Sequence, residues 1–184
     1  MRYTGRVHRR AAGFTILELM FTIAIIAVLA GIAMPSFFGQ SRRAKAASEV
    51  NSVFSDLRTR MDQYLLENSQ YPTSETEAGI WPTSPGSTAQ TVFPLPNDWG
   101  SNGIKVRLSN QTELYCGYSW ITGAPNDAST VGAIAAAAPF NFVPPATVWY
   151  YLFAHCNIDG DNSVDAYYIS DSVNTTIRSL NDGH

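Results

Sequence analysis

A single carboxylate stands in an apolar run of membrane length near the N-terminus. From Phe14 to Phe38 the only charged side chain is that of Glu18, among apolar and small residues. An unpaired charge is costly in the low dielectric of a membrane or a helix bundle, so such a carboxylate is kept where it has a function. The chemistry open to Glu18 is therefore to pair with a cationic partner.

A second group of possible ligands lies near the C-terminus. A pattern that starts at Asp159 resembles the beginning of a calcium-binding loop. Its sixth residue is Val164, where an EF-hand needs glycine, and its twelfth is Ser170, where an EF-hand needs glutamate, so the segment is not an EF-hand. An open calcium site is one interpretation. The other is a polar hairpin turn, which Asp-Gly and Asp-Asn pairs favour. The oxygen-bearing residues at positions 1, 3, 5 and 7 of the pattern are Asp159, Asp161, Ser163 and Asp165.

The sequence lacks the common patterns of enzymes. It has no Gly-x-Ser-x-Gly elbow, no phosphate-binding loop and no His-Glu-x-x-His motif. The three histidines, His8, His155 and His184, stand apart from any nucleophile or acid at a recognisable spacing. The formal net charge of −3 gives no sign of nucleic acid as a partner. We therefore expect a protein that is not an enzyme.

The residues around Glu18 resemble a known processing site. The run Gly13-Phe14-Thr15-Ile16-Leu17-Glu18 follows a short leader that carries four arginines. It resembles the site of type IV prepilins and of the related pseudopilins of type II secretion. In that family a membrane peptidase cuts after the glycine and methylates the new N-terminus. The resemblance implies that Gly13 precedes the cut, that Phe14 becomes the N-terminus, and that Pro35 matches a helix-kinking proline of many pilins.

The resemblance also implies a role for Glu18. It matches the glutamate at the fifth position of the mature chain, and in the family that glutamate is ascribed a role in assembly. Its partner would be the N-terminal amine of a neighbouring subunit, and the pair would set the register of a fibre in a low dielectric.

Two plainer interpretations of the N-terminal segment fit less well. A cleaved secretory signal has an apolar region of about 7–15 residues and a small-residue cleavage site after it. Here the apolar run is longer and the matching signal precedes it. A plain signal anchor fits the length, since the run from Phe14 to Phe38 would span roughly 37 Å as a helix, but it gives no reason for Glu18.

The charges around the span predict its orientation. The leader arginines should keep the N-terminus in the cytoplasm. Three cations, Arg42, Arg43 and Lys45, follow the span and weaken this asymmetry. They contact lipid headgroups or acidic groups of a neighbouring subunit, or they form a solvated basic turn.

The predicted orientation places the two cysteines outside the cytoplasm, where disulfides persist. We predict that Cys116 and Cys156 are paired, with two buried free thiols as the alternative. Loss of residues 1–13 would remove four arginines and no acid, so the formal charge would change from −3 to −7. An acidic head of this kind fits an extracytoplasmic surface.

Apolar periodicity predicts one long helix over 14–68. The segment 14–38 is apolar throughout, and after it apolar residues recur at spacings of three and four. Gly31 and Pro35 are its expected weak points. A long loop rich in Pro, Ser, Thr and Gly follows, and in the pilin family this loop contributes to subunit contacts. The apolar stripe consists of Val50, Phe54, Leu57, Met61, Tyr64 and Leu65.

Strand-like patterns fill the C-terminal half, so the fold class is α+β, with the long helix on an antiparallel sheet of about four strands. Alternation predicts that Trp149, Tyr151 and Phe153 share one face, packed against the helix. The segment 123–145 fits either a loop or a short helix. Strands are expected at 104–108, 113–120, 147–158 and 165–170, with an edge strand in 173–180 and a short one near 91–93.

Together these features predict a cleaved leader (1–13), a long helix (14–68) and a globular head (69–184). The pilin resemblance implies a structural subunit that starts as an inner-membrane precursor and assembles with copies of itself into an extracellular fibre for adhesion, motility or DNA uptake. Its partners would be the prepilin peptidase and the pilus assembly machinery. The alternatives are a pseudopilin of type II secretion, a scarce minor pilin, and an enzyme or binding module on a signal-like anchor.

Overall fold

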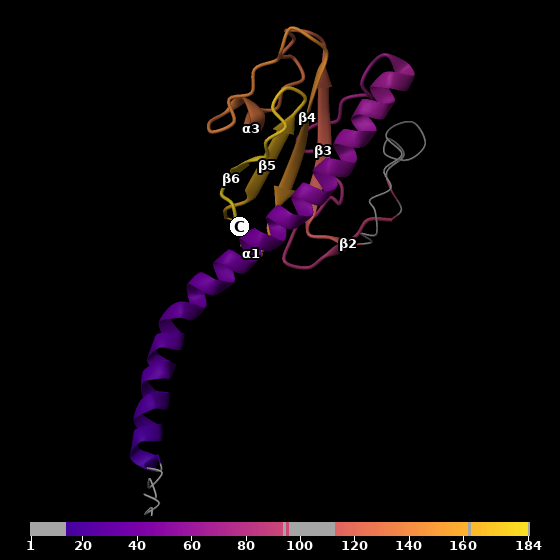
Figure 1. Cartoon of the computed structure of the whole chain (residues 1–184). Helices are drawn as coiled ribbons and strands as arrows, with labels where there is room; N and C mark the ends of the chain where they lie inside the picture. The colour runs from indigo at the N-terminus through magenta and orange to yellow at the C-terminus, as the bar shows by residue number, and fades with distance from the viewer. Residues whose placement is uncertain (1–13, 94, 96–112, 162, 184) are drawn as a thin grey trace, which may run out of the picture. The chain divides into compact units, whose positions relative to one another are not determined.

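The computed structural model describes residues 14–93, 95, 113–161 and 163–183 (Figure 1). The chain divides into two compact units, Met1–Phe38 and Gly39–His184. Helix α1, Ile16–Asn68, belongs to both units. It ends at Asn68, the residue at which the sequence predicts the end of the helix. Ser69 follows with a positive φ of 58° and donates its N–H to the carbonyl of Leu65, which closes the last turn.

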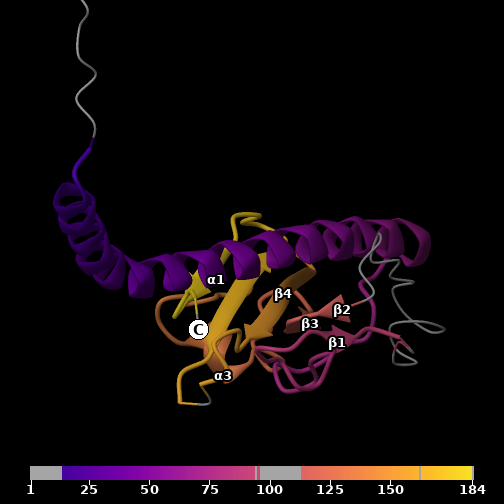
Figure 2. The same ribbon diagram turned by 90° about the horizontal axis from the view of Figure 1, so that it is seen from below.

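The head contains a four-stranded antiparallel sheet in the order β3-β4-β5-β6. A separate two-stranded sheet pairs β1, Gln90–Thr91, with β2, Glu113–Leu114. Figure 2 shows the head half of α1 running along one face of the larger sheet. The four strands are Cys116–Gly123 (β3), Trp149–Cys156 (β4), Ala166–Asp171 (β5) and Arg178–Leu180 (β6).

One core fills the space between α1 and the sheet. The predicted stripe supplies the helix side of it, and Val50, Phe54, Leu57 and Met61 are fully buried. Full burial of a side chain of this size stabilises a fold by about 1.5–3 kcal/mol, so the stripe is what fixes the helix on the head. The sheet side of this core includes Tyr118, Trp120, Tyr150, Leu152 and Ala154.

A second core lies on the other face of the sheet. The segment between β3 and β4 covers it and contains one short helix, α3, Ala133–Ala136. This settles the choice left open for 123–145 as a loop with one helical turn. The second core includes Ile80, Phe140, Phe142, Trp149, Tyr151, Phe153 and Ile169.

The predicted facing of the β4 aromatics is wrong. Trp149, Tyr151 and Phe153 do share a face, but it is the face of the second core, away from α1. Tyr150 and Leu152 are the β4 residues that pack with the helix. Alternation could not choose between the faces, because both are buried and β4 has no polar face to mark the solvent side.

The other predicted strands have mixed outcomes. The strand expected at 104–108 lies outside the described residues. The edge strand expected in 173–180 is limited to the three residues of β6. Part of the long loop after α1 lies along the free edge of β3, where Trp81 and Tyr118 exchange backbone hydrogen bonds. The loop thus protects a sheet edge, which an unpaired strand would leave open to association.

Candidate functional site

The start of α1 carries the motif that sequence singled out. Thr15 precedes the first helical residue, and its Oγ1 accepts a hydrogen bond from the N–H of Glu18 at 3.2 Å. Thr-x-x-Glu is the pattern of a capping box, in which the threonine satisfies an orphan N–H of the first turn. Glu18 also lies where the helix dipole favours a negative charge. The cap holds the helix start in place while the Glu18 side chain remains exposed.

The apolar half of α1 has no cover within its own unit. The segment Ile16–Met34 is long and apolar enough to cross a membrane, and none of it is buried in the described chain. Ile16, for example, is 81% exposed. Burying such side chains away from water is strongly favourable, so this segment requires lipid or neighbouring helices. These are the two environments that a membrane precursor and a fibre core provide.

The remaining residues of the predicted assembly site stand as follows. Gly13 lies outside the described residues, so its role in cleavage stays a prediction. Phe14 is the first described residue and is exposed. The helical backbone of α1 continues through Gly31 and Pro35. A side chain at Gly31 would meet nothing within 4 Å, so packing within this unit gives no reason for a glycine there.

The predicted disulfide is present. Cys116 and Cys156 lie directly opposite each other on β3 and β4, with their Cα atoms 4.3 Å apart. Both are fully buried. The bond closes a loop with a sequence separation of 40 and so restricts the unfolded chain.

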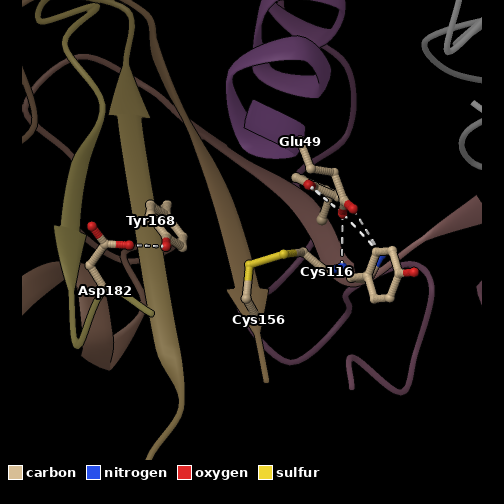
Figure 3. Close-up of a disulfide and its surroundings, with 7 residues drawn as sticks. Glu49, Cys116, Cys156, Tyr168 and Asp182 are labelled. Atoms are coloured by element: carbon tan, nitrogen blue, oxygen red, sulfur yellow. Dashed lines mark hydrogen bonds between the residues drawn. A yellow bond between two sulfur atoms is a disulfide. The ribbon is translucent and has the colours of Figure 1, made fainter. Parts of the chain in front are cut away.

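A buried carboxylate beside the disulfide is a feature that sequence analysis missed. Glu49 reaches from α1 toward the start of β3, next to the disulfide (Figure 3). It accepts hydrogen bonds from the N–H groups of Tyr115 and Cys116 and from the hydroxyl of Tyr118, at 2.9–3.1 Å. Burial raises the pKa of Glu49, and these hydrogen bonds and the charge of Lys45 oppose that rise.

The position of Glu49 on the helix was the signal that could have found it. It lies three residues after buried Ala46 and four before buried Val53, so it belongs to the apolar stripe. The predicted stripe does not include it, because a charge on a helix normally indicates a solvated position. The carboxylate instead ties α1 to the first backbone N–H groups of the sheet.

The C-terminal aspartates adopt the geometry of a turn. Asp159 Oδ1 accepts the N–H of Asp161, and Asp161 Oδ1 accepts the N–H of Ser163. Asp165 Oδ2 lies 3.0 Å from His155 Nε2. In the part of the chain that the structure describes, no three His, Cys, Asp or Glu side chains gather into a group that could hold a metal ion. Calcium binding by Asp159, Asp161 and Asp165 stays a prediction.

Comparisons with known proteins identify the same N-terminal segment. Residues 8–34 match the prokaryotic N-terminal methylation motif. The chain is 34% identical over 102 residues to type II secretion system core protein G of Dickeya chrysanthemi, a match that covers 55% of this chain and 63% of that protein. It is 32% identical over 103 residues to core protein G of Klebsiella pneumoniae, covering 51% and 73%. It is 34% identical over 68 residues to a fimbrial protein of Neisseria meningitidis, covering 37% and 39%.

An exposed apolar helix with a methylation motif, followed by a helix-on-sheet head, defines a pilin-type subunit. The chain belongs to the pilin-like family that includes type II secretion core protein G. It spans just under two thirds of the length of several of these curated relatives. No solved structure matches it. The relatives support the pseudopilin alternative of the sequence analysis better than the type IV pilus that it preferred.

Proposed function

We propose that this protein is a pseudopilin-type subunit that assembles through the first half of α1 into a short helical fibre of a secretion machine. The observation that carries the proposal is the segment Ile16–Met34, which is long enough to cross a membrane and contains no buried residue. The methylation motif at 8–34 overlaps this segment. The relatives named as type II secretion core protein G support the secretion assignment over a long surface fibre.

In this proposal the precursor enters the inner membrane with its leader in the cytoplasm. The prepilin peptidase cuts after Gly13 and methylates Phe14, and assembly machinery extracts the mature chain into the fibre. Glu18 then pairs with the N-terminal amine of a neighbouring subunit. Each charge alone would be costly among packed apolar helices, so the pair selects the register in which both are satisfied.

A subunit of a type IV pilus is the second candidate. The similarity to a fimbrial protein favours it. So do the disulfide and the aromatic C-terminal region. In that case the fibre would be long and extracellular and would serve adhesion, motility or DNA uptake.

Deletion of the gene in the host separates the two candidates. The proposal predicts that specific proteins are lost from the culture medium and accumulate inside the cell envelope, while surface fibres and motility persist. Loss of surface fibres with normal secretion would support the pilus instead. Loss of neither would overturn both assignments.

Complementation supplies the control for this experiment. The unaltered gene should restore secretion, and a Gly13→Arg variant should not, because the precursor stays uncut. A Gly13→Arg product of mature size would count against the assigned cleavage site.

A further inference from the structure

Three cationic side chains lie at the N-terminal start of the head. Arg42, Arg43 and Lys45 lie within the first seven residues of the unit that starts at Gly39. The other basic side chains that the structure describes in the head bond to polar groups of the chain itself. Those bonds are Arg58 to Ser170, Arg60 to Gln63, and Arg178 to Asp171.

None of the three cations takes part in an ion pair among the residues that the structure describes. Arg43 and Lys45 are exposed, and Nε of Arg42 is buried with no hydrogen-bond acceptor in that part of the chain. Nζ of Lys45 lies 3.3 Å from the ring centroid of Tyr115, and its charge also acts on the buried carboxylate of Glu49.

Two neighbouring carboxylates are already committed to other groups. Glu49 accepts hydrogen bonds from β3, as described above. Asp182 accepts a hydrogen bond from the hydroxyl of Tyr168 (Figure 3). The adjacent Gly183 packs tightly on the stem of Arg43. The cluster therefore combines positive charge with one donor, Nε of Arg42, that lacks an acceptor among the described residues, as do Nε of Arg58 and of Arg178 elsewhere in the head.

The position of the cluster along the chain suggests what supplies the acceptor. Arg42 follows Phe38, the last residue of the apolar run, by four positions, which is about 6 Å along a helix. The polar headgroup layer of a bilayer extends roughly 5–8 Å beyond each side of its hydrocarbon core. The rest of the mature head is acidic, so an anionic surface would attract only this end of it.

We propose that Arg42, Arg43 and Lys45 bind the phosphates of anionic phospholipids in the leaflet opposite the leader. The cluster would hold the base of the head on the membrane until the subunit is extracted into the fibre. This inference rests on the membrane insertion given under the proposed function. It gives a purpose to the cations that weaken the charge asymmetry of the span.

Native mass spectrometry of the full mature chain in detergent tests the proposal. The probes are phosphatidylglycerol and phosphatidylcholine at equal concentration, and the readout is the ratio of bound lipids. A cation at an anionic surface is worth about a five-fold gain in binding. We expect the unaltered chain to prefer phosphatidylglycerol. In the triple variant Arg42→Gln, Arg43→Gln, Lys45→Gln, the ratio of bound phosphatidylglycerol to bound phosphatidylcholine should fall at least about ten-fold.

A matched pair of single variants controls for charge. Arg42→Gln should weaken the preference, and Arg60→Gln should not, although both remove one half-buried arginine of α1. Thermal unfolding of the head should show that each variant folds. If the triple variant misfolds, the single pair decides the test.

Equal binding of the two lipids by the unaltered chain would overturn the proposal. So would a triple variant that keeps the preference. If such a variant also failed to enter fibres, the cations would instead meet acidic groups of a neighbouring subunit. Failure of the proposed function is distinguishable, because it would appear as a chain that alkaline extraction releases from membranes, whatever its lipid preference.

Discussion

The two halves of α1 have the same secondary structure and opposite states of burial. In the first half the apolar side chains are exposed, and Leu29 is 61% exposed. In the second half Leu57 is fully buried against the sheet. The sheet of the head packs against the second half of the helix. Among the described residues, nothing covers the first half.

This difference shows where intramolecular folding ends and assembly begins. The head holds both cores and the disulfide, so its stability should depend on its own residues. The apolar half contributes nothing to those cores. Substitutions there should change insertion and assembly and should leave the unfolding of the head unaltered.

The largest effect should come from Glu18→Ala. We expect insertion and processing to continue, but incorporation into fibres should fall to near zero, because the N-terminal amine of a neighbour loses its partner. Quantification of the mature chain in fibre and membrane fractions measures this. Glu67→Ala, which removes another exposed carboxylate of α1, is the matched control. Normal fibre yield from Glu18→Ala would contradict the assigned role.

The next effect concerns the head alone. Replacement of Cys116 and Cys156 by Ser should destabilise the head by about 4 kcal/mol in the chain-entropy model for a loop of this length. Denaturant unfolding of the purified chain, with and without reductant, measures the loss. The unaltered protein under reducing conditions should behave like the double variant. An unchanged midpoint would show that the disulfide contributes little.

A matched pair of leucines tests the comparison directly. Leu57→Ala should lower the free energy of unfolding of the head by about 2–5 kcal/mol, because it leaves a cavity in the core between α1 and the sheet. Leu29→Ala should leave it unchanged. Denaturant unfolding of both variants in the same detergent is the measurement. Equal effects would mean that the two halves of α1 are not energetically distinct.

The smallest effect is the pH dependence of Glu49. Burial raises the pKa of Glu49 in the folded head above the ordinary value of a glutamate, about 4.5, so the folded state binds the proton more tightly. The contribution of Glu49 to stability should therefore rise as the pH falls from above the folded pKa toward about 4.5, and then level off. The gain is at most about 1.4 kcal/mol per pH unit.

Glu49→Gln isolates this contribution, since its side chain does not titrate. The stability of the unaltered head relative to Glu49→Gln should increase as the pH is lowered through that window. Unfolding curves of both proteins at several pH values measure the difference. A pH-independent difference would show that the proton on Glu49 is not linked to folding.

Much of this molecule can be predicted from local sequence. The stripe containing Val50 and Phe54 predicts the buried helix face, and the Gly-Phe-Thr-x-x-Glu run by itself identifies the N-terminal site. Each of these signals is carried by residues that lie close together in the sequence. The predicted pairing of Cys116 with Cys156 needed only the orientation of the span.

The features that sequence did not predict depend on contacts between distant segments. The facing of Trp149 required knowledge that residues 131–142 cover the second face of the sheet. The burial of Glu49 depends on backbone donors 66 and 67 residues away, at Tyr115 and Cys116. A charge on a helix normally indicates a solvated position, and here tertiary hydrogen bonds reverse that expectation.

Intact-mass spectrometry of the native chain from the cell envelope of the host, with sheared surface fibres as a second sample, tests the central claim most directly. We expect a chain that begins at methylated Phe14 in the envelope, where the exposed half of α1 moves from lipid into a short fibre, and little of it among the sheared surface fibres. An envelope chain that still carries residues 1–13 would contradict this expectation.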